Sequence, residues 1–142
     1  MRHSTKFANA IHVLVYAYLR ADWQMSSKLI ANSVNTTPVT IRQLTSELNK
    51  AGLIATKSGS GKIKFVRSPE EITLLDIFNA VTDQQLIERN AKTNSHCQVG
   101  KQMPSLLDNT FDQIENAAKK EMAQITLADV IKQVDLSKNT QP

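Results

Sequence analysis

Residues 26–67 decide the fold of this chain, and they read SSKLIANSVNTTPVTIRQLTSELNKAGLIATKSGSGKIKFVR. A short helix pattern opens at Ser26, and a second helix is predicted to start at Thr37-Pro38. Thr37 can cap this helix, and Pro38 suits the first helical position because the N–H group that it lacks would have no partner there. Gly52 is expected to end the helix in a left-handed conformation.

A β-hairpin is predicted directly after this second helix. The runs 53–57 and 62–67 are β-like, and residues 62–65 alternate polar and apolar as in a half-buried strand. Between them, Ser58-Gly59-Ser60-Gly61 is typical of a turn. Helix, tight turn, helix and hairpin in this order predict a winged helix-turn-helix, a module that places its second helix in the major groove of DNA.

Charge is divided unevenly along the chain. Residues 1–67 carry ten lysines and arginines against two acids, a net charge of +8, whereas residues 68–142 carry seven bases and eleven acids, a net charge of −4. Such a division indicates a basic part that meets a polyanion and an acidic part with another role.

Helical patterns are also predicted on both sides of this module. Before it, one apolar stripe comprises Phe7, Ala10, Ile11, Leu14, Val15, Tyr18 and Leu19. After it, Thr73 and Thr126 are expected to cap helices, each with an acid three residues on. Residues 90–102 are interpreted as a loop, and Pro104 as the start of a long helix. The predicted fold is therefore mainly α, with a small β-hairpin wing and a long C-terminal helix.

Ser68-Pro69 is expected to mark a boundary in the chain. The sequence then divides into a winged helix-turn-helix over 1–67, a linker helix, loop and long helix over 68–134, and a mobile polar tail over 135–142.

Composition narrows the class of protein further. A single cysteine excludes an intrachain disulfide and suits a reducing compartment, and no apolar run reaches the roughly 20 residues that a membrane span needs. No phosphate-binding loop, nucleophile elbow or zinc-protease motif is present, so we do not expect an enzyme. The chain is predicted to be soluble and cytoplasmic, without a membrane partner.

Several segments resemble the bacterial Rrf2 family of winged-helix regulators. These are Ile41-Arg42-Gln43-Leu44, Leu48-Asn49-Lys50-Ala51-Gly52-Leu53-Ile54 and Ser68-Pro69-Glu70-Glu71-Ile72-Thr73-Leu74-Leu75-Asp76-Ile77. Further on, Cys97-Gln98-Val99-Gly100 and Ile125-Thr126-Leu127-Ala128-Asp129 are similar to the branch of the family that carries no cluster. The resemblance covers most of the chain in order.

This resemblance implies a homodimer in which long helices from the C-terminal half cross. The stripe expected to form the dimer contact comprises Leu107, Phe111, Ile114, Ala118 and Met122. Cluster-binding members of the family have three cysteines before the long helix, whereas this chain has Cys97 alone. Because thiolates hold iron–sulfur clusters as a set, we predict no cluster, no metal site and no other cofactor.

The second helix of the module, which begins at Thr37-Pro38 and is called the recognition helix below, supplies the first candidates for DNA contact. Its N-terminal turns carry Thr36, Thr37, Thr40, Arg42 and Gln43. Hydroxyl groups bind phosphates or bases, and arginine or glutamine can pair bidentately with guanine or adenine. The alternative is that the threonines only cap the helix and Arg42 is a solvated charge.

The hairpin and scattered bases supply the rest of the predicted DNA-binding set. Lys57, Lys62 and Lys64, with Ser58, Gly59, Ser60 and Gly61 between them, would lie beside the phosphate backbone, where each neutralised phosphate releases counterions. The family resemblance adds Arg2 and Lys6, which match its basic start before a long helix, and Lys28 completes the set. The alternative for the lysines is that they protect an exposed edge strand from pairing with another chain.

Three hypotheses for function follow. The first is a sequence-specific transcriptional regulator, a repressor that binds double-stranded DNA at a near-palindromic operator as a homodimer. The second is a regulator that responds to oxidation through Cys97, although this exposed-loop thiol can equally be unreactive. The third is a winged helix that binds a protein and no DNA. No set of residues identifies an effector.

Overall fold

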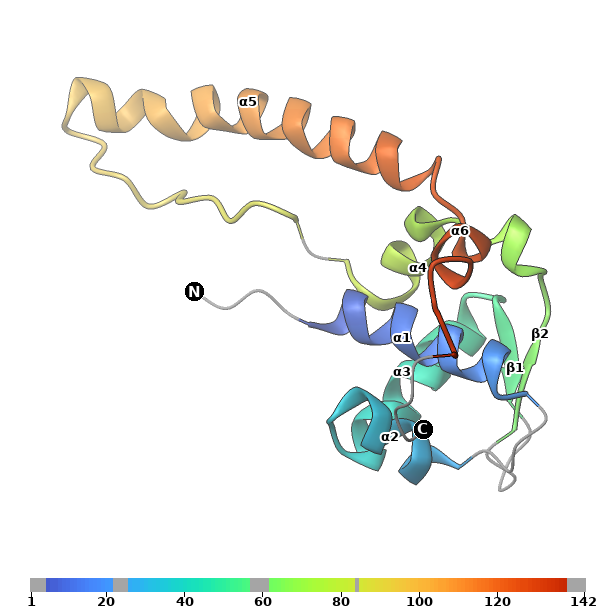
Figure 1. Ribbon diagram of the computed structural model, residues 1–142. Helices are drawn as coiled ribbons and strands as arrows, with labels where there is room; N and C mark the ends of the chain where they lie inside the picture. Colours follow the sequence, from blue (N-terminus) through green and yellow to red (C-terminus); the bar gives the residue numbers. More distant parts are fainter. Residues whose placement is uncertain (1–4, 22–25, 57–61, 84, 138–142) are drawn as a thin grey trace.

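A computed structural model describes residues 5–21, 26–56, 62–83 and 85–137. Its elements are, in order, α1 (Lys6–Leu19), α2 (Ser27–Val34), α3 (Pro38–Lys50), β1 (Ile54–Thr56), β2 (Ile63–Phe65), the 3-10 turn η1 (Pro69–Glu71), α4 (Leu74–Val81), α5 (Gln98–Met122) and α6 (Leu127–Ile131). β1 and β2 pair antiparallel, with Ile54 opposite Phe65 and Thr56 opposite Ile63. This confirms the predicted fold class, mainly helical with a two-stranded wing (Figure 1).

One hydrophobic core joins α1, α2, α3, β1, α4 and α6. Its members from the first half of the chain include Leu14, Ile41 and Leu48, and those from the second half include Ile77 and Leu127. Packing therefore continues across the boundary expected at Ser68-Pro69. The boundary does not separate two cores. That it separates a DNA-binding part from a part with another role stays a prediction.

The buried face of α1 differs from the predicted stripe. Val13 and Ala17, which the stripe omitted, are fully buried with Ala10 and Leu14, whereas Tyr18 is 45% exposed. The ring of Tyr18 instead packs edge-on against Phe65 of the wing, with the ring centroids 5.8 Å apart. The prediction for Tyr18 was wrong because its partner, Phe65, lies far along the chain in the wing, and the periodicity of one helix cannot reveal such a contact.

The helix ends follow the capping predicted for them. Thr37 accepts a hydrogen bond from the Thr40 N–H at 3.2 Å, and Pro38 is the first residue of α3. Gly52 has φ +80° after α3, as predicted. Thr73 and Thr126 cap α4 and α6 with full capping boxes, confirming both assignments.

The start of α5 is a correction to the sequence analysis. The helix begins at Gln98, inside the expected loop, and Pro104 lies within it. Pro104 has no N–H to donate to the Gly100 carbonyl four residues earlier, but the Thr93 hydroxyl donates to that carbonyl instead. The proline is thus tolerated because another donor replaces the missing one.

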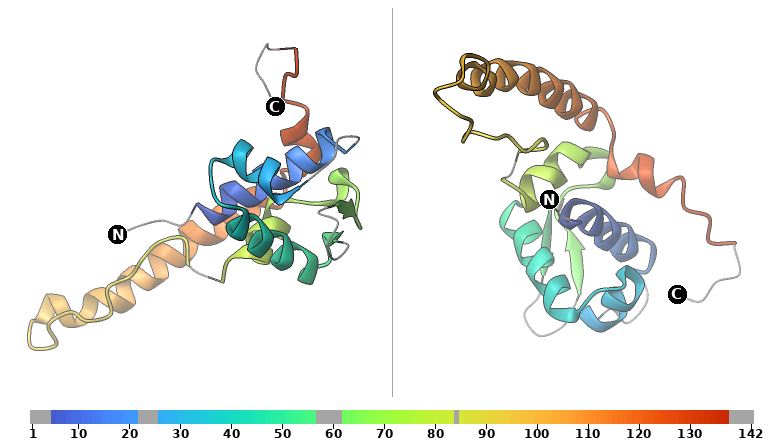
Figure 2. Two further views of the ribbon diagram at one scale, coloured as in Figure 1. Left: turned by 90° about the horizontal axis from the view of Figure 1, so that it is seen from below. Right: turned by 90° about the vertical axis from the view of Figure 1, so that its left-hand side faces the viewer.

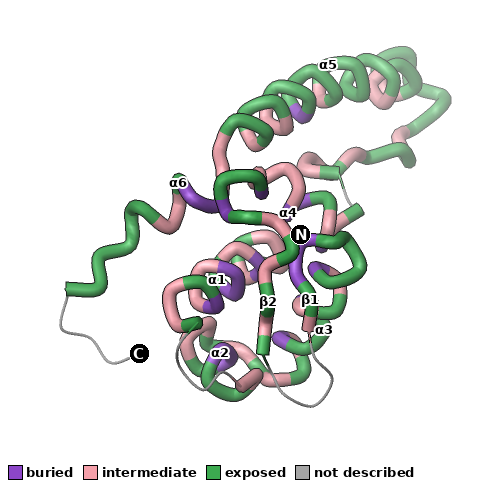
Figure 3. The backbone as a smooth tube through the Cα atoms, turned by 90° about the vertical axis from the view of Figure 1, so that its right-hand side faces the viewer, coloured by how far each residue is buried: buried purple, intermediate pink, exposed green. Residues whose placement is uncertain are grey.

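The helix α5 and the segment before it project from the body of the molecule. Residues 85–97 run back along α5, and both extend well beyond the other helices (Figures 1 and 2). Most of α5 is exposed, whereas buried residues concentrate in the body (Figure 3). Within the described residues, none of the helices combines the length and the apolar character that crossing a membrane requires.

The chain returns from α5 to the body through an isolated β-bridge between Thr73 and Thr126. The Leu74 N–H donates to the Ile125 carbonyl at 2.9 Å, and the Leu127 N–H donates to the Ile72 carbonyl at 2.8 Å. These reciprocal bonds place the start of α6 beside the start of α4, so that Leu127 enters the core.

Candidate nucleic-acid interface

The helices α2 and α3 form a tight helix-turn-helix. Ser26 caps α2, and Asn35 ends it in a left-handed conformation with φ 63°. The Thr36 N–H donates back to the Ala31 carbonyl at 2.9 Å, which fixes the turn just before the cap of α3. Because asparagine tolerates this conformation better than most residues, the sequence itself specifies the turn.

The outward face of α3 is exposed and, apart from Val39, polar. Ile41, Leu44 and Leu48 are buried on the opposite face, whereas Arg42 and Gln43 are exposed. Ser46 and Lys50, which the predicted set omitted, continue this exposed face toward the end of the helix. Ser46 lies four residues after Arg42 and three after Gln43, and Lys50 lies four residues after Ser46, so helical spacing is the signal that could have identified both.

The threonines at the start of α3 are engaged with one another. The Thr37 and Thr40 hydroxyl oxygens lie 3.0 Å apart in a hydrogen bond, and Thr37 also caps the helix. Thr36 is half-buried in the turn. Thr37 is thus engaged as the capping residue and Thr40 as its hydrogen-bond partner, which favours the alternative interpretation for these two.

The wing lies beside the C-terminal end of α3. The Asn49 side-chain amide donates to the Thr56 hydroxyl at 3.3 Å, linking α3 to β1. Lys62, directly before β2, and Lys64, within it, are both exposed. The remaining predicted wing residues, Lys57, Ser58, Gly59, Ser60 and Gly61, lie outside the described residues, as does Arg2.

The two other predicted bases have different surroundings. Lys28 is exposed in the first turn of α2. Lys6 forms an ion pair with Glu47 of α3, with a distance of 2.9 Å between its Nζ and Oε1 of the carboxylate. Arg67, at the end of the wing, donates to the Glu71 carbonyl and to the Asp76 carboxylate, so that it holds the wing against α4.

A charged cluster attaches the segment before α5 to one face of that helix. Arg89 lies 2.9 Å from the Asp112 carboxylate and 3.4 Å from those of Asp108 and Glu115. Its guanidinium carbon also lies 5.8 Å from the ring centroid of Phe111. Glu115 is 6% exposed and accepts the Ile87 N–H at 2.9 Å.

This cluster determines which part of α5 stays exposed. Phe111, Ala118 and Met122 of the predicted dimer stripe are half-buried within the chain. Leu107 and Ile114 of the same stripe are exposed, together with Val99 and Leu106, which the prediction omitted. The sequence pattern could not identify this face, because the pairing of Arg89 with three acids on α5 depends on the path of residues 85–97.

Cys97 is exposed and caps the N-terminus of α5. Its sulfur accepts the Gly100 N–H at 3.4 Å, and this bond, with a second from Val99, lowers the pKa of the thiol. The described residues bring no three histidine, cysteine or acidic side chains together as metal ligands. A single cysteine, whose sulfur is engaged at a helix cap, does not fit the set of thiolates that an iron–sulfur cluster needs.

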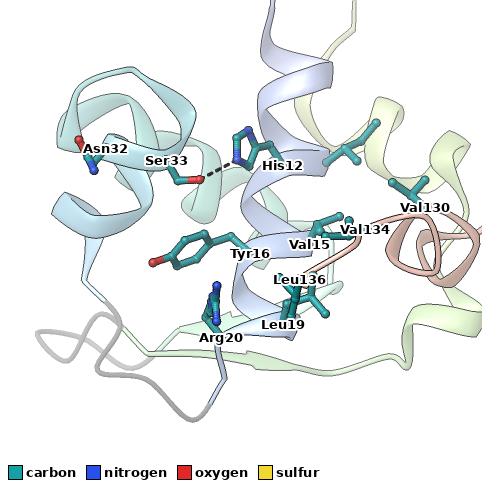
Figure 4. Close-up of a pocket in the computed structure, with 11 residues that line it drawn as sticks. His12, Val15, Tyr16, Leu19, Arg20, Asn32, Ser33, Val130, Val134 and Leu136 are labelled. Carbon is teal, nitrogen blue, oxygen red and sulfur yellow. Dashed lines mark hydrogen bonds between the residues drawn. The ribbon is translucent and has the colours of Figure 1, made fainter. Parts of the chain in front are cut away.

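A groove of about 580 Å³ runs over α1, between α2 and the chain that follows α6 (Figure 4). His12 and Ser33 lie on its α2 side, joined by a hydrogen bond of 2.9 Å, and Tyr16 lies below them, whereas Val15, Val134 and Leu136 line the opposite side (Figure 4). Burial lowers the pKa of His12. A polar wall opposite an apolar one suits a small amphipathic molecule.

A winged helix whose recognition helix, α3, is exposed is the defining feature of helix-turn-helix regulators, and this is the class of the protein. A family model described as "Rrf2: Iron-dependent Transcriptional regulator" matches residues 3–133. The chain belongs to the Rrf2 family of transcriptional regulators, which are not enzymes.

Individual relatives agree with this assignment. The chain is 35% identical over 129 residues to YwnA of Bacillus subtilis (strain 168), which is named as an HTH-type transcriptional regulator. The matched residues cover 90% of this chain and 96% of YwnA. A crystal structure described as a DNA-binding protein shares 34% identity and a TM-score of 0.69, over 89% of this chain and 98% of that one. CymR, the global cysteine regulator of B. subtilis, shares 22% identity and a TM-score of 0.66, over 95% of this chain and 99% of its own. This last likeness supports the fold alone.

Proposed function

We propose that this chain is a sequence-specific DNA-binding repressor that acts in the cytoplasm on a near-palindromic operator, as a homodimer. The exposed face of α3 carries this proposal. The helix-turn-helix holds α3 at the surface, and its N-terminal half presents Arg42 and Gln43 to solvent. Either side chain can pair bidentately with a purine edge in the major groove. The exposed Lys64 of the wing would neutralise phosphates beside the groove.

The exposed stripe on α5 supports the homodimer. Val99, Leu106 and Ile114 are 67%, 56% and 51% exposed on a helix that projects from the body. A second copy that packs on this stripe would remove the apolar surface from water. Two copies related by a two-fold axis would then present their recognition helices to grooves about one helical turn apart. Repression follows where such an operator overlaps a promoter, since a bound dimer would exclude polymerase.

The test is selection of binding sites from a random duplex pool, followed by fluorescence anisotropy of the selected site at increasing salt. We expect a two-fold motif whose affinity falls steeply with salt, and Arg42→Ala should lower specific affinity. Lys101→Ala, which removes an exposed base from α5, is the control. No enriched motif and a shallow salt dependence would support the third hypothesis, a winged helix that binds a protein.

A second candidate rests on the lowered pKa of Cys97. With hydrogen peroxide, the thiolate sulfur attacks one oxygen, the O–O bond breaks and hydroxide leaves, so that sulfur is oxidised to sulfenic acid. In this second proposed function, the dimer releases DNA once Cys97 is oxidised. If Cys97→Ser loses DNA affinity in peroxide to the same extent as the parent protein, the thiol has no such role.

A further inference from the structure

Val39 is the exposed apolar side chain of the recognition helix. It is the second residue of α3 and is 64% exposed, whereas the apolar residues Ile41, Leu44 and Leu48 of the same helix are buried. Arg42 and Gln43 lie three and four residues further on, so the three side chains share one face of the helix. The valine methyl groups thus lie on the face proposed to enter the groove.

The neighbours of Val39 in the first turn of α3 are engaged within the protein, so Val39 is the side chain of this turn that is placed to contact a base. The Thr37 and Thr40 hydroxyls are bonded to each other at 3.0 Å, and Pro38 is half-buried. Recognition helices contact base edges mainly through their N-terminal residues. The side chain best placed for such a contact in this turn is therefore aliphatic, and no hydrogen bond to a base is available to it.

The major groove offers one apolar group to such a side chain. Among the four base pairs, only those with thymine present a methyl group, on C5 of the base. We propose that Val39 reads a thymine methyl in each half-site of the operator and so determines specificity at that position. This inference rests on the proposed function, because it names a specificity determinant of the same interface.

The experiment removes only the methyl group. In the selected operator, each thymidine in turn is replaced by deoxyuridine, symmetrically in both half-sites, and binding is measured by anisotropy. The parent protein should lose about fourfold in affinity per half-site at one position, the effect of burying one methyl group. With Val39→Ala, which lacks the two γ-methyl groups, the same replacement should have a clearly smaller effect at that position.

Val134→Ala is the matched control, because Val134 is 42% exposed and lies after α6, on neither the recognition helix nor the exposed stripe of α5. This variant should keep the full sensitivity to deoxyuridine. Since Val39 is exposed and alanine favours helices, Val39→Ala is expected to fold as the parent does.

The outcomes separate the two proposals. A selected half-site without thymine, or deoxyuridine effects that are equal in the parent and Val39→Ala, would overturn the role of Val39 and leave the regulator intact. Failure to select any motif would overturn the proposed function, and the role of Val39 with it.

Discussion

Lys6 and Glu47 form an ion pair of 2.9 Å that ties the first turn of α1 to the recognition helix. Glu47 is the one acidic residue in the sequence of α3. The pair therefore compensates the single negative charge on the helix proposed to enter DNA, and it links α3 to the N-terminal end of α1.

A double-mutant cycle measures this link. Lys6→Met and Glu47→Gln should each lower the free energy of unfolding, and the double variant should lose less than the sum of the two. Because both side chains are partly exposed, we expect a coupling energy of about 0.5 kcal/mol from urea unfolding. Additive single and double changes would show that the pair does not stabilise the fold.

The contribution of the wing to DNA binding can be read from salt dependence. Lys64→Gln should lower the affinity for every duplex and reduce the slope of log affinity against log salt by about one per protomer. Lys101→Gln, on α5, should leave the slope unchanged. Equal slopes for the parent and Lys64→Gln would leave the wing lysine with the alternative role of protecting an edge strand.

The exposed stripe on α5 makes a prediction about assembly. Ile114→Glu places a charge in the proposed dimer contact and should yield monomers in sedimentation velocity. Asn116→Glu places the same charge on an exposed position of the same helix, two residues from Ile114 and so on a different face, and should leave the dimer intact. Dimers with Ile114→Glu, or a monomeric parent protein, would contradict the proposed contact.

The partial burial of His12 predicts a pH dependence of stability. Burial lowers the pKa of His12 in the folded state below its ordinary value of 6.5, so the unfolded chain takes up a proton first as pH falls. The stability is complete above pH 6.5 and is lost as pH falls from there through the folded pKa. His12→Asn should flatten urea midpoints over this range, and profiles that coincide with the parent would refute the assignment.

The hydrogen bond from Thr93 to the Gly100 carbonyl predicts a compensation with Pro104. Thr93→Val should destabilise the parent by about 1 kcal/mol, because the carbonyl loses its donor. In the Pro104→Ala background, the restored backbone N–H can bond to this carbonyl, so Thr93→Val should cost less. Chemical denaturation of the four proteins tests this, and equal costs in both backgrounds would exclude the exchange of donors.

The local signals in the sequence predicted the body of the molecule well. The cap at Thr37, the left-handed Gly52 and the capping boxes at Thr73 and Thr126 each depend on residues a few positions apart, and all were confirmed. The winged-helix class followed from their order.

The features that were missed depend on distant partners. Pro104 looked like a helix start because its replacement donor, Thr93, lies eleven residues earlier in an irregular segment. The exposed face of α5 depends on Arg89, whose pairing with Asp112 no periodicity reveals. Val39 was overlooked because an apolar residue in a helix is usually assigned to the core.

The β-bridge between Thr73 and Thr126 has a mechanical consequence for the proposed dimer. The C-terminal end of α5 rejoins the body through two backbone hydrogen bonds of 2.9 and 2.8 Å, beside the capped start of α4. Turning α5 relative to the body would bend or break both bonds. If two copies are held together by α5, the distance between their recognition helices is therefore set at this junction, far from any base pair.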